Sequence, residues 1–296
     1  MALSLGLLLT ENNASFNCGH FPAKLKLGQI TPLLKKAGLD ATDDCNFRPI
    51  SNLPTMSKLL DSLVLSRLQP HLLSSPSYST LQSAYWSLHS TETALLKVTG
   101  DIYRSLDSGS FTALVSLDIS AAYDTIDHSV VSSHLQSDFS IDGKALAWNQ
   151  SHLSDRHSFV QVNCSAACQQ PCVAGVPQGS VLGPLLFTAY ISPIGRVVRW
   201  FGVNHHTYTD DTQLYVETAD GALDRLSHCI SCLQHWFLRN HLLLNGSKSE
   251  AIIIGTAQRH ARSLQPPQMN VTESCVAVSE SLKLLGVTFD RTMSFR

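Results

Sequence analysis

The sequence predicts an α+β fold, in which helices and strands follow one another without the regular βαβ repeat of parallel-sheet proteins. Apolar residues between Met56 and Leu73 recur at the spacing of an amphipathic helix. Residues 204–217 instead read as two strands joined by a tight turn. Because 44% of the 296 residues are hydrophobic, the chain can bury a sizeable core.

The first third of the chain predicts an extended segment followed by two helices. Residues 24–36 alternate basic and apolar groups, and two prolines keep residues 46–54 extended. The helix at 56–73 comes next. A second helix is expected at 91–106, with Ser90 or Thr91 as its N-cap.

The middle of the chain predicts a buried strand that ends in a carboxylate. Residues 111–118 form a short apolar run ending in Asp, and a helical pattern then continues to about Leu135. Residues 158–164 alternate like a surface strand. Gly and Pro mark 175–184 as a loop, which opens a helix that includes 185–191.

The last third begins with the hairpin at 204–217, whose tip carries an acidic pair. A helix from about 220 to 241 and a strand at 251–254 are expected after it. Residues 258–268 read as a polar linker, and residues 282–290 as one further strand.

The charges nearly cancel, with 21 basic and 23 acidic residues and a net charge of -2. Any surface for a polyanion must therefore be local. Residues 101–150 carry seven acids against two bases, whereas residues 1–70 and 239–296 both lean basic. An acidic centre between basic flanks suits a metal site beside a phosphate path, and ordinary solvated faces are the alternative.

Eight cysteines are present, and no secretory signal precedes them. We expect free thiols in an intracellular protein, of the nucleus or cytoplasm, that is not secreted. The spacing of Cys164, Cys168 and Cys172 is not that of a zinc module. The longest stretch without charged residues, 157–195, is broken by prolines, which argues against a membrane span. The apolar start, residues 1–10, is expected to be a helix.

Three carboxylates are the strongest candidates for chemistry: Asp118 at the end of the buried strand, and Asp210 with Asp211 at the hairpin tip. Neighbouring carboxylates raise one another's pKa unless a cation neutralises them. Sheet pairing that brought these three together would create a site for a hard cation. Taken alone, the Asp-Asp pair has a simpler reading as a solvated turn.

A series of short motifs follows the order of the chain. They are Phe-Arg-Pro-Ile-Ser (47–51), His-Ser-Thr-Glu-Thr-Ala-Leu (89–95), Leu-Asp-Ile-Ser-Ala-Ala-Tyr-Asp (117–124), Gly-Val-Pro-Gln-Gly-Ser-Val-Leu-Gly-Pro (175–184), Tyr-Thr-Asp-Asp (208–211) and Leu-Leu-Gly-Val-Thr-Phe-Asp (284–290). This series resembles the reverse transcriptase motifs of vertebrate non-LTR (LINE-type) retrotransposons. Val-Pro-Gln-Gly-Ser followed about thirty residues later by Tyr-x-Asp-Asp is the most specific combination. The resemblance covers the chain from about residue 20 to its end.

This resemblance implies a right-hand polymerase fold with fingers, palm and an incomplete thumb. The fingers would span 1–110 and the palm 111–256, of which 157–177 would belong partly to the fingers. Residues 257–296 would form the primer grip and a truncated thumb remnant. The implied enzyme is a nucleotidyltransferase, an RNA-directed DNA polymerase that adds deoxynucleotides to a primer 3′-end.

Three alternatives remain open on the sequence. A truncated, weakly active or inactive remnant would at most bind nucleic acid. A translation product without a fold would have no function. An RNA-dependent RNA polymerase shares the palm chemistry but is disfavoured by Tyr123.

The resemblance also implies a metal site. Asp118 and Asp210 would bind two Mg²⁺ ions, for which Mn²⁺ could substitute, and Asp211 would complete the acidic cluster. The backbone carbonyl of Ile119 would also reach a metal. The partners would be an RNA template, a DNA primer and deoxynucleoside triphosphates, with no membrane.

Five further residues would contact the nucleotide. Tyr123 would be the steric gate against a 2′-hydroxyl, with a core aromatic as the alternative. Gln178 and Gly179 would contact the incoming nucleotide and the template. Arg48 would bind the triphosphate, or else form a surface ion pair. Lys248 would protonate the leaving pyrophosphate, or else be an exposed turn lysine.

Overall fold

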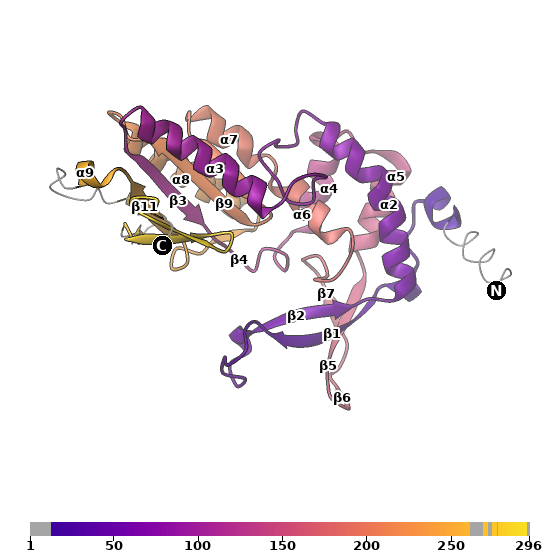
Figure 1. Ribbon diagram of the computed structural model, residues 1–296. Coiled ribbons are helices and arrows are strands. Elements are labelled where there is room, and N and C mark those ends of the chain that lie inside the picture. The colour runs from indigo at the N-terminus through magenta and orange to yellow at the C-terminus, as the bar shows by residue number, and fades with distance from the viewer. Residues whose placement is uncertain (1–12, 261–268, 272–273, 277, 295–296) are drawn as a thin grey trace. The chain divides into compact units, whose positions relative to one another are not determined.

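The computed structural model describes residues 13–260, 269–271, 274–276 and 278–294. The chain divides into two compact units, each built from two separate stretches (Figure 1). The first unit comprises Met1–Tyr78 and Tyr123–Tyr190, and the second comprises Ser79–Ala122 and Ile191–Arg296. Both contain a sheet and helices, which confirms the α+β class. The division does not follow the expected limits of fingers and palm, so that assignment stays a prediction.

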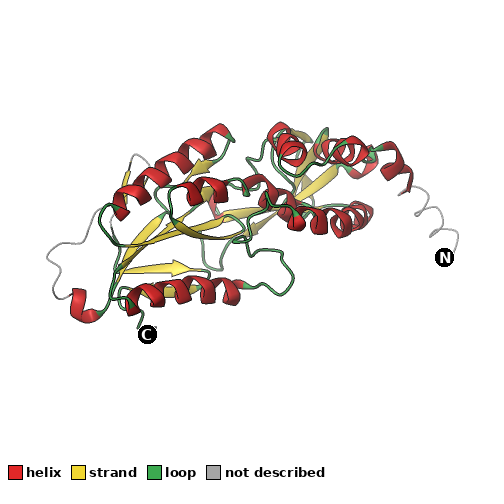
Figure 2. Cartoon of the chain, turned by 90° about the horizontal axis from the view of Figure 1, so that it is seen from above, coloured by secondary structure: helices red, strands yellow, loops and turns green. Residues whose placement is uncertain are grey.

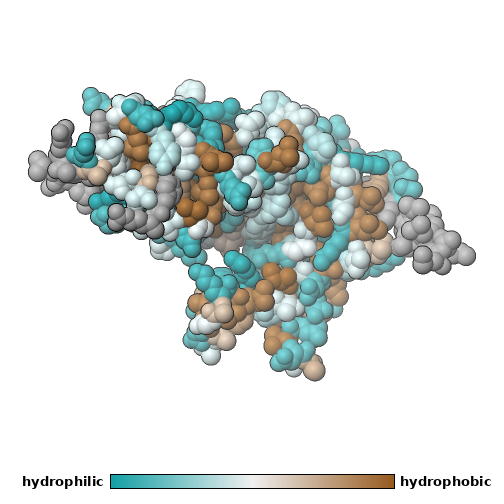
Figure 3. Space-filling view, viewed as in Figure 1, coloured by the Kyte–Doolittle hydropathy of each residue, from teal (hydrophilic) through white to brown (hydrophobic). Residues whose placement is uncertain are grey.

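The sheet of the first unit combines an antiparallel hairpin with a parallel strand. Its strands are β1 (Leu27–Leu34), β2 (Phe47–Asn52), β5 (Arg156–Val162), β6 (Ser165–Ala166) and β7 (Gln170–Cys172). β1 pairs antiparallel with β2 and parallel with β5, which also pairs with β6 and β7. Leu33, Val160 and Val162 are exposed on these strands. Figure 3 shows such apolar groups mixed with hydrophilic ones around the strands.

Helices supply most of the core of the first unit. They are α2 (Thr55–Ser74), α4 (His128–Ser137), α5 (Gly143–Leu153) and α6 (Gly183–Ile191), with short 3-10 turns η1 (Ala23–Leu25) and η2 (Asp44–Asn46). The helix expected at 56–73 matches α2 to within one residue at each end. Leu60, Leu72 and Phe187 are at most 1% exposed, as in a close-packed core.

The helical pattern expected after Asp118 begins later than predicted. Residues 121–125 form a turn, in which Ala121 has a positive φ of 47°. The Asp127 carboxylate then accepts hydrogen bonds from the backbone N–H groups of Ser129 and Val130, which caps α4 and fixes its start. The pattern therefore covers a turn and a shorter helix.

The second unit is organised around a four-stranded sheet in the order β11-β3-β9-β8. Its strands are β3 (Thr112–Leu117), β8 (Asn204–Tyr208), β9 (Asp211–Glu217) and β11 (Glu250–Ile254). A second, small pairing joins β4 (Ile119–Ser120) to β10 (Leu243–Leu244). β3 lies between β9 and β11, and Ala113, Leu114 and Val115 are fully buried. The buried strand predicted to end at Asp118 and the predicted hairpin are both present.

Helices cover both faces of this sheet. α3 (Thr91–Asp107) and α8 (Ala222–Arg239) lie on opposite faces, and α7 (Ile194–Trp200) contacts β8 and α8 (Figure 2). A capping box starts α3, because Ser90 and Thr93 each bond the backbone N–H of the other. Val98 and Ile102 of α3 then pack on Leu114 in the core.

The prediction of one strand at 282–290 is wrong. The segment is a hairpin of β14 (Ser281–Leu284) and β15 (Val287–Asp290). Leu285 and Gly286 both have positive φ values, of 47° and 92°, which a two-residue primed turn requires. Leu282, Leu284 and Phe289 join the core of α3.

The expected linker at 258–268 begins with a short helix, α9 (Ala257–His260), and its residues 261–268 lie outside the described residues. A small hairpin of β12 (Met269–Val271) and β13 (Ser274–Val276) follows. The helix expected at residues 1–10 also falls outside the described part of the chain. Within that part, none of the helices combines the length and apolarity needed to span a lipid bilayer.

Candidate active site

One edge of the second unit's sheet gathers the three carboxylates predicted to carry chemistry. The register pairs Leu117 of β3 with Thr212 of β9, so Asp118, the next residue, reaches the level of Asp211. Tyr208 and Asp211 close the β8–β9 hairpin, which leaves Thr209 and Asp210 as its two-residue turn. The end of β3 and the β8–β9 turn, almost a hundred residues apart in the sequence, thus place their acidic residues at one edge of the sheet.

These carboxylates interact electrostatically. Burial, with the negative charges of Asp210 and Asp118, raises the pKa of Asp211 to about 6. Burial also raises the pKa of Asp118, against an opposing effect of Lys248. Mutual repulsion of this kind is relieved when a cation binds, so the edge carries the charge pattern of a cation site.

The donor chemistry fits a hard divalent cation, because all three side chains offer carboxylate oxygens. As they stand, however, no group of three or more His, Cys, Asp or Glu side chains within the described residues is arranged to hold a metal ion. The carboxylates share an edge without forming a finished ligand set. Binding a cation there would require their side chains to turn toward it.

The segment after β10 wraps around Asp118. The backbone N–H of Asn245 donates to the carbonyl of Asp118 at 2.8 Å, and the N–H of Asp118 donates to Ser249 Oγ at 3.3 Å. Lys248 lies within this segment, which explains its effect on the pKa of Asp118. Ile119 pairs with Leu244 across the β4–β10 bridge. The structure thus brings Lys248 and Ile119 beside Asp118.

The first unit holds four of the five residues expected to contact a nucleotide, since Lys248 belongs to the second unit. The ring of Tyr123 is half-buried and stacks on that of Phe187, with centroids 5.0 Å apart and an interplanar angle of 27°. Gln178 Nε2 donates to both carboxylate oxygens of Asp124, at 3.1 and 3.2 Å. Burial of that carboxyl group raises the pKa of Asp124, although the residue as a whole is exposed and the bond from Gln178 opposes the shift.

Close backbone packing explains why a glycine occupies position 179. Its φ is 118°, and a Cβ there would lie 2.6 Å from the carbonyl oxygen of Ser51. The N–H of Ser51 donates to the carbonyl of Gln178 at 2.7 Å, so the loop is fastened to β2. Arg48 is exposed on that same strand, opposite Leu33 of β1.

A buried polar network that no local pattern in the sequence indicates supports this loop. Asp61 on α2 is fully buried, and its carboxylate accepts from the backbone N–H of Val181 at 3.2 Å. His152 Nε2 lies 3.0 Å from the other carboxylate oxygen. Burial lowers the pKa of Arg156, against the effect of Asp61, while its Nε donates to the carbonyl of His152 at 2.6 Å. Nothing local in the sequence marks Asp61, because its partners lie some 90 to 120 residues away.

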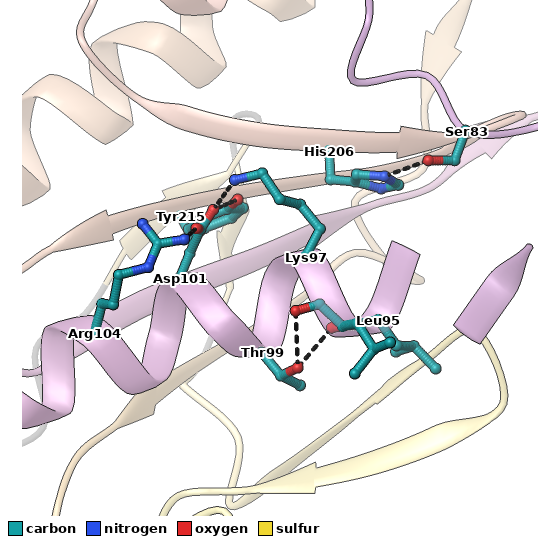
Figure 4. Close-up of polar contacts among 9 residues, drawn as sticks. Ser83, Leu95, Lys97, Thr99, Asp101, Arg104, His206 and Tyr215 are labelled. Atoms are coloured by element: carbon teal, nitrogen blue, oxygen red, sulfur yellow. Dashed lines mark hydrogen bonds and ion pairs between the residues drawn. The ribbon is translucent and has the colours of Figure 1, made fainter. Parts of the chain in front are cut away.

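A second network fastens α3 to the sheet. Asp101 accepts hydrogen bonds from Lys97, Arg104 and the hydroxyl of Tyr215, as Figure 4 shows. Burial opposes ionisation of Asp101, but the bonds from Lys97 and Tyr215 outweigh it, so its pKa is lowered. Because Tyr215 is on β9, this contact ties α3 to the strand that begins with Asp211.

Two adjacent buried histidines give this unit a pH-dependent stability. Burial lowers the pKa of His205 and His206 to about 4 each, and both are 2% exposed. The unfolded chain therefore binds more protons below about pH 6.5, so stability is lost as pH falls through that window. The raised pKa of Asp211 has the opposite effect, because it favours the folded chain as the pH falls. Together these three groups should give a loss of about 2 kcal/mol between pH 7 and pH 5, measured by urea unfolding.

The matched variants for that prediction carry Gln in place of histidine. Replacing His205 and His206 together with Gln should flatten the pH dependence. His235 is exposed, and its replacement with Gln should leave the dependence unchanged. An equally steep dependence in the double variant would show that other groups cause it.

Comparison with protein families decides the class of this chain. A family model described as "Reverse transcriptase (RNA-dependent DNA polymerase)" matches residues 34–289. The chain belongs to the reverse transcriptase family. The match extends over both units of the structure, from β1 to β15.

Polymerases of insect mobile elements are similar to this reverse transcriptase domain. A "Probable RNA-directed DNA polymerase from transposon X-element" of Drosophila melanogaster is 27% identical over 287 residues. The "RNA-directed DNA polymerase from mobile element jockey" of the same species is 25% identical over 290 residues. Each alignment covers 96% of this chain but 31% of the relative. The domain is thus homologous to RNA-directed DNA polymerases of non-LTR retrotransposons and is a nucleotidyltransferase by family.

Solved telomerase structures share the fold of this reverse transcriptase. "Structure of apo telomerase from Candida Tropicalis truncated from C-terminal domain" matches with a TM-score of 0.64 at 12% identity, covering 92% of this chain and 55% of that one. "Structure of telomerase from Candida Tropicalis in complexe with TWJ fragment of telomeric RNA" gives 0.62 at 13% identity, covering 99% and 48%. These neighbours agree with the predicted right-hand polymerase fold.

Proposed function

We propose that this chain catalyses RNA-templated addition of deoxynucleotides to a primer 3′-end, as the reverse transcriptase domain of a LINE-type element. The observation that supports the proposal most is the strand register that brings Asp118, Asp210 and Asp211 to one sheet edge. Burial and the charges of the other two acids raise the pKa of Asp211 there. The more specific resemblance to vertebrate elements rests only on the residues of the motifs. The mobile-element polymerases that are similar to this chain come from insects.

Asp118 and Asp210 would hold two Mg²⁺ ions, with Asp211 completing the acidic cluster and the Ile119 carbonyl as a further donor. When bound, such ions would activate the 3′-hydroxyl and stabilise the leaving pyrophosphate. Lys248, beside Asp118, would donate a proton to the departing pyrophosphate. The coupled carboxylates supply the negative charge that the ions need.

Four residues of the first unit would contact the nucleotide. Tyr123, supported by its stack on Phe187, would close the space that a 2′-hydroxyl needs. Gln178 and Gly179 would contact the nucleotide and the template, with Gly179 allowing close backbone approach. The exposed guanidinium of Arg48 would bind the triphosphate.

Primer extension on poly(rA)/oligo(dT) with dTTP tests the proposal. Extension in Mg²⁺ that EDTA abolishes and Mn²⁺ restores is the expected result. A folded chain that extends no primer in either metal would contradict it.

Binding of nucleic acid without synthesis is the second candidate function. It is favoured by the incomplete arrangement of the carboxylates. The net charge of -2 argues against it, because it leaves little general attraction for a polyanion. A filter-binding assay on the same preparation separates the two. Binding without extension would support this candidate and exclude the first.

Replacing Tyr123 with Val should relax the choice between deoxynucleotides and ribonucleotides. The smaller side chain opens the space under the sugar, so the preference for dTTP over UTP should fall by about 10- to 100-fold, the size of effect that a filled or emptied pocket gives. The measurement is kcat/KM for each nucleotide. Unchanged discrimination would mean that Tyr123 is only a packing partner of Phe187. Replacement with Phe, which keeps the ring, is the control.

A further inference from the structure

The hairpin turn that carries Asp210 has a strained backbone. Thr209 is the first of the turn's two residues and has a positive φ of 59°. A positive φ at that position alone is type II′ geometry, for which glycine is the usual residue. A β-branched side chain in this region is strained, and it stays there only if its surroundings hold it.

One buried side chain holds both polar groups of this residue. Gln82, 2% exposed, accepts a hydrogen bond from the Thr209 N–H at 3.0 Å and donates from Nε2 to the Thr209 carbonyl at 3.2 Å. Gln82 Oε1 also accepts from the N–H of Ala84 at 3.1 Å. Because two N–H donors face Oε1, the orientation of the amide is defined.

Gln82 itself is fixed to the hairpin through its backbone. We call residues 81–83 the clamp segment. The segment forms a parallel bridge to β8, in which Thr207 N–H donates to the Leu81 carbonyl at 2.9 Å and Ser83 N–H donates to the Thr207 carbonyl at 3.0 Å. Ser83 Oγ also lies 2.8 Å from His206 Nε2, a contact drawn in Figure 4. The Gln82 amide therefore sits on a rigid support.

We propose that Gln82 is a positioning residue that holds Thr209 in the left-handed conformation and thereby sets Asp210 and Asp211 on the sheet edge. Without its amide, the turn would lose both bonds and relax toward negative φ, which would swing the carboxylate of Asp210 away from Asp118. Thr209 is buried, so its N–H and carbonyl would also lack partners. The inference rests on the proposed function, because the position of these acids matters for catalysis only if they act in polymerisation.

Replacing Gln82 with Met tests this, since Met fills a similar volume but can neither donate nor accept in the same way. The affinity for Mn²⁺, titrated with MnCl₂ and followed by the EPR signal of the free ion, should fall about tenfold. In primer extension kcat should fall about tenfold, while KM for dTTP stays within twofold. If Gln82 had only a structural role, Gln82→Met would lower the stability but would leave the Mn²⁺ affinity and kcat unchanged.

A second substitution shows whether Gln82 acts through the strained turn. Glycine adopts a positive φ without penalty. In a chain that already carries Thr209→Gly, adding Gln82→Met should therefore lower the Mn²⁺ affinity by no more than about threefold. Ser83→Ala is the matched control. It removes another buried hydrogen bond of the clamp segment and should leave Mn²⁺ affinity and kcat within twofold.

Several outcomes would overturn the inference. They are an unchanged Mn²⁺ affinity in Gln82→Met, an equal loss in Ser83→Ala, an undiminished loss in the Thr209→Gly background, and a wild-type chain that binds no Mn²⁺. If Gln82→Met does not fold, hydrogen exchange of the wild-type Thr209 amide decides, since fast exchange would exclude a lasting bond to Gln82. Failure of the wild-type chain to extend primers would refute the proposed function, whereas the Mn²⁺ titration still tests the positioning.

Discussion

Replacing Asp210 with Asn is expected to reduce primer extension by at least about 10³-fold, because a two-metal site loses a charged ligand. The same change should not weaken the fold. The negative charge of Asp210 is one cause of the raised pKa of Asp211, so removing it relieves repulsion. Stability in urea should therefore stay the same or rise while activity disappears, and both are measured on one preparation.

Asp220 offers the matched control. It is an exposed acid on the loop after β9 in the same unit, and its replacement with Asn should leave extension within twofold. If Asp210→Asn extended primers at a rate within tenfold of the wild-type rate, Asp210 would not be a catalytic residue. A fall in stability as large as the fall in activity would indicate damage to the turn instead.

Replacing Asp61 with Ala is expected to destabilise the protein by about 3 to 5 kcal/mol, because it breaks a fully buried charged network and leaves the rest unpaired. Arg156, 3% exposed, would lose its nearby negative charge, and the N–H of Val181 would lose its acceptor. Urea unfolding can be followed by the fluorescence of Trp148, which is 2% exposed and stacks on His152 at 5.4 Å.

The control for Asp61 is Asp142→Ala. Asp142 is exposed at the start of α5 and makes no capping hydrogen bond with its side chain, so the change should cost less than about 1 kcal/mol. A cost for Asp61→Ala as small as that of the control would mean that the buried network contributes no net stability.

The local parts of the site were readable from the sequence. The apolar run before Asp118 predicted a buried strand, and the alternating residues around Asp210 predicted a hairpin, since each pattern depends on neighbours in the chain. The N-cap of α3 was predicted to be Ser90 or Thr91, and the structure shows Ser90; a cap can be predicted because it depends on residues within one turn. These patterns alone sufficed to propose three acids on one sheet.

Features that depend on distant partners were not predicted. Gln82 meets Thr209 across 127 positions and Asp61 meets Val181 across 120, so no local pattern marks either residue. The strain at Thr209 was missed for a related reason, because a threonine in Tyr-Thr-Asp-Asp gives no sign of a positive φ. The division into two units also escaped prediction, since each unit joins two stretches that are separate in the sequence.

The proposed function is the copying of RNA into DNA at the edge that carries Asp118, Asp210 and Asp211. The most direct measurement is a run-off reaction on a heteropolymeric RNA with an annealed DNA primer, Mg²⁺ and all four deoxynucleotides, followed by sequencing of the product. We expect a DNA strand complementary to the RNA up to its 5′-end. A folded chain that makes no product, or adds nucleotides unrelated to the template, would contradict the account.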